Sequence, residues 1–179
     1  MSSTEALNHV IAVAAANADQ VDAEGSYPLA AVDALRGSGL LGLILHKEVG
    51  GLGAGPKQFV DVVGTLAAAC GSTAMIYLMH TAAAVTVAAA PPPCAPELLY
   101  AMASGKALGT LAFSERGSRS HFWAPVSTAA LSDDGTTVKL RADKSWVTSA
   151  GYADMYIVST GSTSGVAGEV DLYALPMSV

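Results

Sequence analysis

Charged side chains are scarce in this sequence. They make up 13% of its 179 residues, about half of the usual share in soluble domains. The nine basic residues are scattered and are outnumbered by 15 acidic ones, which gives a net charge of −6 at pH 7. A nucleic-acid partner or a polybasic membrane patch would need clustered Lys and Arg, so we expect neither. Hydrophobic residues make up 51% of the chain, which is enough to bury a core and argues against a disordered protein.

Cysteine is nearly absent, with only Cys70 and Cys94. They do not form a Cys-x-x-Cys pair, and no set of His and Cys residues has the spacing of a zinc site. We therefore expect two buried apolar thiols and no metal. The first residues also lack the basic region and the long apolar run of a signal peptide, so we expect a cytoplasmic protein.

The first 105 residues predict a bundle of helices. Apolar residues recur there at helical spacing, between glycine and proline breaks. The expected helices cover residues 3–22, 28–37, 56–70, 74–90 and 96–103. After the second helix, the apolar run over residues 40–45 predicts a buried extended segment.

The helix expected over residues 74–90 carries no charge, because no Asp, Glu, Lys or Arg lies between Asp61 and Glu97. Its length would also allow a membrane span. However, His80 and two threonines lie within it, its alanines are weakly hydrophobic, and no Lys/Arg asymmetry flanks it. We therefore favour a helix buried inside the bundle over a membrane span.

After residue 105 the pattern changes to short runs that are typical of strands. The expected strands cover residues 108–114, 136–142, 145–148, 155–160 and 170–175. Asp133-Asp134-Gly135 supplies a hairpin turn between two strands. The sequence thus predicts an α+β fold, with an all-helical bundle in residues 1–105 followed by an antiparallel β domain in residues 106–179.

Three short motifs occur in this order along the chain. Residues 48–53 read Glu-Val-Gly-Gly-Leu-Gly, residues 111–120 read Leu-Ala-Phe-Ser-Glu-Arg-Gly-Ser-Arg-Ser, and Trp-Val-Thr stands at residues 146–148. Alone, the glycine cluster favours a mobile turn, since Pro56 stands where a nucleotide loop would need glycine. Together, the motifs resemble the Glu-x-Tyr/Phe-Gly-Gly-x-Gly, Thr-Glu-Pro-x-x-Gly-Ser-Asp and Trp-Ile-Thr segments of the acyl-CoA dehydrogenase superfamily. The resemblance extends from about residue 29 to the end of the sequence.

This resemblance implies a flavin cofactor, FAD or alternatively FMN. The flavin would be held by two sets of residues: Leu111, Ala112, Phe113, Ser114, Gly117 and Ser120 in one segment, and Trp146, Val147 and Thr148 in the other. Such residue types suit the task, because hydroxyls and backbone N–H groups meet carbonyl and phosphate oxygens without adding charge. Tryptophan adds a flat apolar wall. By the same resemblance, Ser120 would also touch the acyl-CoA substrate.

Other polar residues leave alternatives open. His80 lies on a helix that would line the acyl pocket and could bind substrate; the alternative is a core histidine with a backbone or side-chain partner. We expect Glu115 to make a structural hydrogen bond and Asp154 to cap a turn.

The motif over residues 111–120 and the residue after it also depart from the family pattern. Arg116 replaces the usual proline, and Arg119-Ser120-His121 replaces Gly-Ser-Asp. The arginines could pair with a phosphate or be solvated loop charges. His121 could assist a flavin or be a surface residue.

The resemblance implies the α,β-dehydrogenation of an acyl-CoA thioester, as in fatty acid metabolism. It also implies that the protein is an oligomer and that an electron-transfer partner takes up the electrons. In that family the α-proton is taken by a glutamate on a second helical domain after the sheet, because this step needs a positioned base. The sequence ends at Val179 before such a domain, so the catalytic residue is unknown. We expect little or no dehydrogenase activity from the chain alone. A truncation, a split protein completed by a second chain, and a remnant with another role all fit.

Two other functions fit the same residues. One is a flavin monooxygenase on the same fold, which needs no glutamate base and agrees with the departures at Arg116, Arg119 and His121. The other is a non-catalytic subunit that docks a partner through its uncharged helices.

Overall fold

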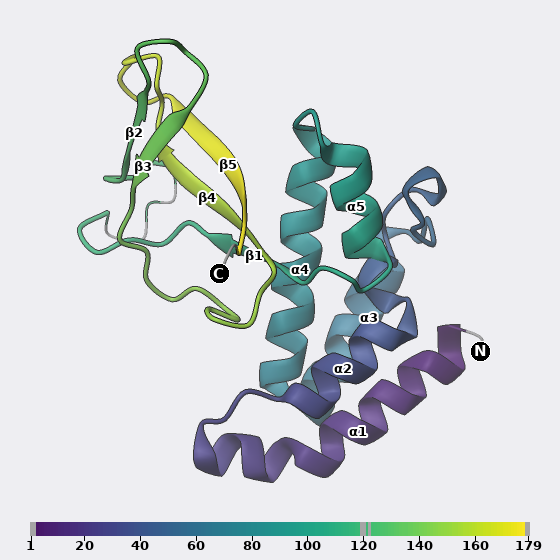
Figure 1. Cartoon of the computed structure of the whole chain (residues 1–179). Coiled ribbons are helices and arrows are strands. Elements are labelled where there is room, and N and C mark those ends of the chain that lie inside the picture. Colours follow the sequence, from purple (N-terminus) through teal and green to yellow (C-terminus); the bar gives the residue numbers. More distant parts are fainter. Residues whose placement is uncertain (1–2, 119–120, 122, 178–179) are drawn as a thin grey trace.

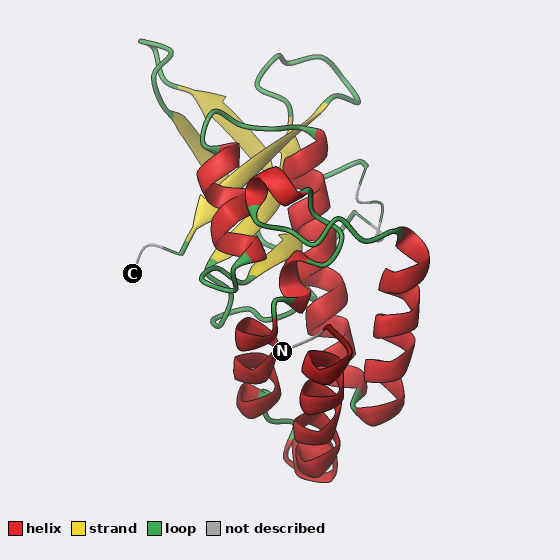
Figure 2. Cartoon of the chain, turned by 90° about the vertical axis from the view of Figure 1, so that its right-hand side faces the viewer, coloured by secondary structure: helices red, strands yellow, loops and turns green. Residues whose placement is uncertain are grey.

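The computed structural model describes residues 3–118, 121 and 123–177. Helices occupy the chain up to residue 103 and strands occupy the chain beyond it (Figure 1). The helical part and the sheet part lie against each other (Figure 2). The predicted α+β class and the order of its two parts are confirmed.

In the described residues, five α-helices lie close to the positions that the sequence predicts. They are α1 (Ser3–Glu24), α2 (Leu29–Ser38), α3 (Pro56–Ala69), α4 (Gly71–Ala89) and α5 (Ala95–Ala103). Their apolar faces meet in a core that includes Val10, Leu35, Leu66 and Tyr77. Gly39 ends α2 with a φ of +76°, a conformation that favours glycine.

The segment after α2 is not extended, contrary to the expectation for residues 40–45. Two short 3-10 helices, η1 (Leu40–Gly42) and η2 (Lys47–Val49), fold it into successive turns. The N–H groups of Leu43 and Leu45 donate to the carbonyls of Leu40 and Gly42. These leucines are nevertheless buried. A compact turn and a strand can both bury an apolar run, so the sequence pattern alone does not distinguish them.

Helix α4 lies at the centre of the molecule and contacts α2, α3, α5 and the first strand. Within the described residues it is the one helix whose length and composition would allow it to cross a membrane, and half of its apolar window is buried inside the protein. Its contacts are those of a helix inside a bundle, the alternative that the sequence favours. Cys70, just before α4, is buried as expected, whereas Cys94 is exposed because it lies in the turn between α4 and α5.

Three strands form a sheet in the order β1-β4-β5: β1 (Gly109–Ala112), β4 (Met155–Gly161) and β5 (Val170–Pro176). Strands β4 and β5 are antiparallel, as expected. Strand β1, however, runs parallel to β4. The long connection between them allows this, and it contains a separate antiparallel hairpin of β2 (Thr128–Leu131) and β3 (Val138–Arg141).

Two strand assignments from the sequence differ from the structure. Residues 145–148 form no strand, because Trp146 has a φ of +58°, a left-handed conformation that interrupts an extended chain. Strand β2 was not expected, since Thr-Ala-Ala-Leu is short, mostly exposed and without clear alternation. The turn predicted at residues 133–135 does join β2 to β3, and Gly135 has a φ of +71° there.

The two predicted domains share a buried cluster. Ala84 of α4, Met102 of α5 and Ile157 of β4 belong to it. Where the helical part ends, Gly105 has a φ of +76°, and a Cβ atom there would lie 2.2 Å from the carbonyl oxygen of Arg36. Only glycine allows the chain to pass α2 this closely. The domain boundary near residue 105 stays a prediction.

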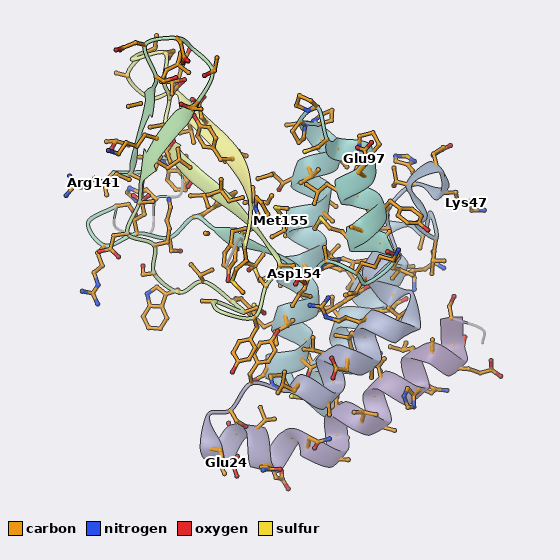
Figure 3. All side chains as sticks on the ribbon, in the orientation of Figure 1. Glu24, Lys47, Glu97, Arg141, Asp154 and Met155 are labelled. Carbon is orange, nitrogen blue, oxygen red and sulfur yellow. The ribbon has the colours of Figure 1, made fainter. Side chains whose placement is uncertain are left out.

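An ion pair also joins the two parts. Arg36 of α2 lies 2.7 Å from Asp154 and donates to the Gly105 carbonyl at 2.9 Å. The same Asp154 oxygen accepts the Leu108 N–H at 2.7 Å. Asp154 lies just before β4, next to Met155 (Figure 3). It therefore links α2 to the start of the sheet, and the turn cap expected from the sequence is wrong.

Candidate functional site

The two segments singled out in the sequence meet in the structure. The Ser145 N–H donates to the Ser114 carbonyl at 2.9 Å, and Glu115 and Lys144 form an antiparallel bridge. Further along, the Thr110 hydroxyl donates to the Thr148 carbonyl at 2.7 Å. Residues 111–118 and 144–148 thus lie side by side.

A buried ion pair between Glu115 and Lys144 holds this meeting point. Their side chains are 0% and 8% exposed, respectively. The Lys144 ammonium also donates to the carbonyl and hydroxyl of Ser159 on β4. The second Glu115 oxygen accepts the N–H groups of Val126 and Ser127. Glu115 therefore has the structural hydrogen bonds expected of it, and the role of Lys144 is one that the sequence did not reveal.

The Glu115 carboxyl of this pair favours its ionised form. Burial alone raises the pKa of the Glu115 carboxyl, but the hydrogen bonds from Lys144 and from the N–H groups of Val126 and Ser127 together hold that pKa below its usual range. A carboxylate with both oxygens engaged in this way is a poor candidate for proton abstraction.

The Trp146 side chain is almost fully exposed to solvent. It is 93% exposed, although it is the largest side chain in residues 144–148, and its backbone is left-handed. Such strained residues are uncommon outside glycine and gather at functional sites. Within the described part of the chain, the hydroxyls of Ser114 and Thr148 make no hydrogen bond. An exposed indole and free hydroxyls in the same two segments are groups that suit a planar aromatic ring with hydrogen-bond acceptors, as a flavin has.

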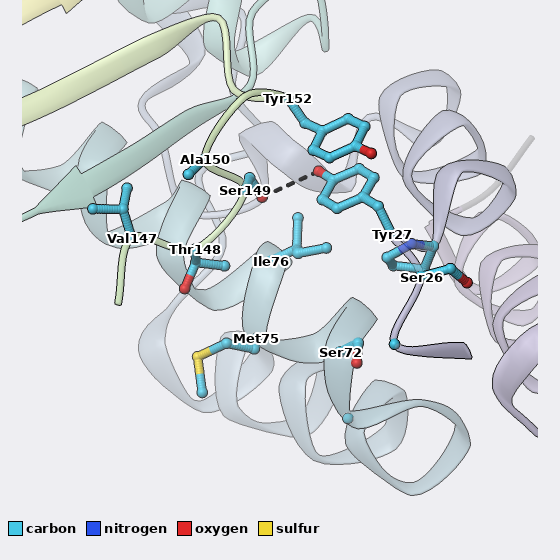
Figure 4. A pocket seen from close by; sticks show the side chains of 13 residues that line it. Ser26, Tyr27, Ser72, Met75, Ile76, Val147, Thr148, Ser149, Ala150 and Tyr152 are labelled. Atoms are coloured by element: carbon cyan, nitrogen blue, oxygen red, sulfur yellow. Dashed lines mark hydrogen bonds between the residues drawn. The ribbon is translucent and has the colours of Figure 1, made fainter. Parts of the chain in front are cut away.

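A cleft of about 730 Å³ lies beside this segment (Figure 4). Residues 25–28, the first turns of α4, residues 147–150 and Tyr152 line it, and none of the lining side chains is charged. Tyr27 stacks on Tyr152 with ring centroids 3.8 Å apart, and its hydroxyl donates to the Ser149 hydroxyl at 3.1 Å. The volume suits a small-molecule site. These three residues could not be identified from the sequence, because no local pattern links Tyr27 to Ser149, 122 positions further along the chain.

Val147 lies between this cleft and a second one. The second cleft, of about 450 Å³, is lined by Val147 together with Ala112, Lys144 and Tyr156. Two of the predicted flavin contacts, Ala112 and Val147, therefore face one space.

The remaining predicted contacts are placed differently. Leu111 and Phe113 pack against the cluster shared by α4, α5 and β4. Gly117 is exposed, with a φ of +91°. Ser120 lies outside the described residues, as does Arg119.

His80 is fully buried in α4. Its Nδ1 accepts the Gly109 N–H of β1 at 3.0 Å, which assigns the proton of the neutral ring to Nε2. Burial lowers the pKa of His80 to about 4; the Leu41 carbonyl opposes this, and the Arg36 charge adds to it. This geometry is that of a core histidine with a backbone partner. Contact between His80 and a substrate stays a prediction.

Two of the positions that depart from the family pattern, Arg116 and His121, lie at the surface. Arg116 is exposed and forms no ion pair with a described residue, as expected of a solvated loop charge. His121 is exposed too and stacks on Trp123, with ring centroids 4.9 Å apart.

Comparison with known proteins decides the family. The model of the acyl-CoA dehydrogenase N-terminal domain matches residues 4–106, which is more than half of the chain. The chain belongs to the acyl-CoA dehydrogenase family. Within this family, the probable acyl-CoA dehydrogenase YngJ of Bacillus subtilis (strain 168) is 31% identical over 151 residues, which cover 81% of this chain and 38% of that protein.

Solved structures with the acyl-CoA dehydrogenase fold match the whole described arrangement. Butyryl-CoA dehydrogenase from Megasphaera elsdenii has a TM-score of 0.84 at 20% identity, over 99% of this chain and 49% of that one. Methanesulfinate monooxygenase MsuC from Pseudomonas fluorescens has a TM-score of 0.80 at 25% identity, over 98% and 43%. The chain thus spans about half or less of the length of these relatives.

Proposed function

We propose that this chain forms the helical and flavin-contacting part of an acyl-CoA dehydrogenase, which removes hydrogen from the α- and β-carbons of an acyl-CoA thioester. The observation that carries the proposal is the meeting of residues 111–118 and 144–148 beside the bare Trp146 ring. Two structures with the same fold hold flavins: TdsC from Paenibacillus sp. A11-2 with FMN and PigA with FAD. They support a flavin of either kind as the ligand.

In this proposal the chain's own residues bind and orient the cofactor. Trp146 covers one face of the ring, while the hydroxyls of Ser114 and Thr148 and the N–H groups of residues 111–118 donate to its acceptors. Ser120 and His80 are the proposed substrate contacts. When bound, the flavin supplies the two-electron acceptor.

The base that takes the α-proton is not among the described residues of this site. Glu115 is the carboxylate there, and both of its oxygens are engaged. We therefore propose that a polypeptide segment outside these residues supplies the base, and that an electron-transfer partner takes up the electrons. A cytoplasmic location belongs to the same proposal.

The test mixes the 179-residue chain with FAD, CoA thioesters of several lengths and an electron-accepting dye. We expect flavin retention without turnover of the dye. Clear turnover by the chain alone would show that the base lies within these residues and that our assignment of Glu115 is wrong.

A flavin monooxygenase on the same fold is the second candidate. The match to MsuC and the exposed His121 favour it. Oxygen uptake that needs both the chain and a flavin reductase would support it, whereas a flavin-loaded chain that takes up no oxygen would count against it.

A third candidate is a non-catalytic subunit that docks through α4. This uncharged helix exposes Met75 and Val85. A stable complex with a second chain, and flavin affinity only within that complex, would favour this role. A chain that binds flavin alone would contradict it.

A further inference from the structure

We propose that the buried Glu115–Lys144 ion pair is a positioning pair, which fixes residues 144–148 against residues 111–118 and thereby sets the direction of the Trp146 ring. The proposal rests on the function given above, because that function makes Trp146 a contact of the flavin. The pair acts through the chain segment that it anchors.

Neither charge could be buried here without the other. The two side chains are almost fully removed from water, and an unpaired ion in such a place is costly, whereas a paired and hydrogen-bonded ion is tolerated. Ser159 completes the bonds of the lysine, and the N–H groups of Val126 and Ser127 complete those of the glutamate. Removal of either partner leaves the other charge buried and unpaired.

The pair joins four segments that are distant in sequence: the chain after β1, the chain before β2, the segment of Trp146, and β4. Lys144 lies opposite Glu115 in an antiparallel bridge, and the Ser145 N–H reaches the Ser114 carbonyl in the same register. A slip of one residue would break both contacts and turn every following side chain to the other face.

Trp146 receives little support from packing, so its direction follows from its backbone. That backbone is held on one side by Lys144 and Ser145, and on the other by the Thr110 hydroxyl, which donates to the Thr148 carbonyl. A left-handed tryptophan between two anchors persists only while its surroundings impose that conformation. Without the first anchor, we expect the segment to relax.

The test compares Lys144→Met, Glu115→Gln and the double variant. The matched control is Lys57→Met with Asp61→Asn, because that ion pair has an N–O distance of 2.8 Å but lies exposed within a single helix. Three quantities are measured on the 179-residue chain: the melting temperature, the exchange rate of the Ser145 amide hydrogen, and the dissociation constant of FAD.

The double variant decides between positioning and simple stabilisation. Each single variant should lower the melting temperature, and the double variant should recover it, because no unpaired charge is left. In the double variant we still expect the Ser145 amide to exchange at least about tenfold faster than in the wild type, and FAD to bind about tenfold more weakly. The control should change none of the three quantities. Wild-type exchange and wild-type FAD affinity in the double variant would overturn the proposal.

The same measurements distinguish a failure of the positioning role from a failure of the proposed function. If the wild type retains no FAD, but Ser145 exchange still rises in the double variant, the pair positions the segment and the flavin assignment is wrong. If the wild type and the double variant bind FAD equally well, with equal Ser145 exchange, the flavin site stands and the positioning role is wrong.

Discussion

His80 makes the stability of this protein depend on pH in a direction that the structure fixes. Its ring is buried and neutral, with a pKa of about 4, whereas the ordinary value in an unfolded chain is 6.5. Between these values the unfolded chain takes up a proton that the folded chain does not. The stability that His80 contributes is therefore complete above about pH 7 and is lost as the pH falls towards 4. The pKa difference corresponds to about 3 kcal/mol in total, of which about 2 kcal/mol is lost by pH 5.

The assay is urea unfolding at several pH values between 7.5 and 4.5, on the wild type and on His80→Gln. Glutamine does not titrate, and its side-chain oxygen can still accept the Gly109 N–H. All other acidic groups and histidines are common to both proteins, so the difference in unfolding free energy isolates His80. We expect the wild type to lose about 2 kcal/mol relative to the variant between pH 7 and pH 5. Two parallel pH curves would refute a buried neutral His80.

Three further predictions concern the packing around the site. Ile157→Ala should lower the free energy of unfolding in urea by about 2–5 kcal/mol, whereas the control Val166→Ala, in an exposed loop, should lower it by less than about 0.5 kcal/mol. Small effects of both substitutions would contradict the shared core. Gly105→Ala should lower the melting temperature more than Gly25→Ala, because Gly25 has a similar φ of +61° but no atom within 4 Å of an added Cβ; equal shifts would contradict the close approach to α2. Tyr27→Phe should cost about 1 kcal/mol in urea unfolding through the lost bond to Ser149; no change would mean that this bond adds nothing in solution.

The helices and most strands could be predicted because each depends on neighbours in sequence. Helical spacing and glycine or proline breaks locate α1 to α5, and the Asp-Asp-Gly turn locates the start of β3. Residues 145–148 were misassigned because the pattern favours a strand, whereas the contacts at Lys144 and Thr148 impose a left-handed Trp146. Tertiary contacts outweighed local preference there.

The site itself was predicted only in outline. The motifs indicated which two segments matter, and the structure brings those segments together. The partners that hold them could not be read from the sequence, since Glu115 and Lys144 are 29 residues apart and no local spacing links them. The same holds for the parallel pairing of β1 with β4 and for the stack of Tyr27 on Tyr152.

The central claim is that residues 111–118 and 144–148 form a flavin site, and the visible absorption spectrum of the purified chain tests it most directly. The chain is incubated with FAD and then freed of unbound cofactor. We predict a retained flavin spectrum that disappears in Trp146→Ala/Thr148→Ala. It should persist in the control Tyr100→Ala/Thr65→Ala, which removes an exposed ring and an exposed threonine from α5 and α3. A folded wild type without flavin, or a Trp146→Ala/Thr148→Ala variant that keeps it, would contradict the claim.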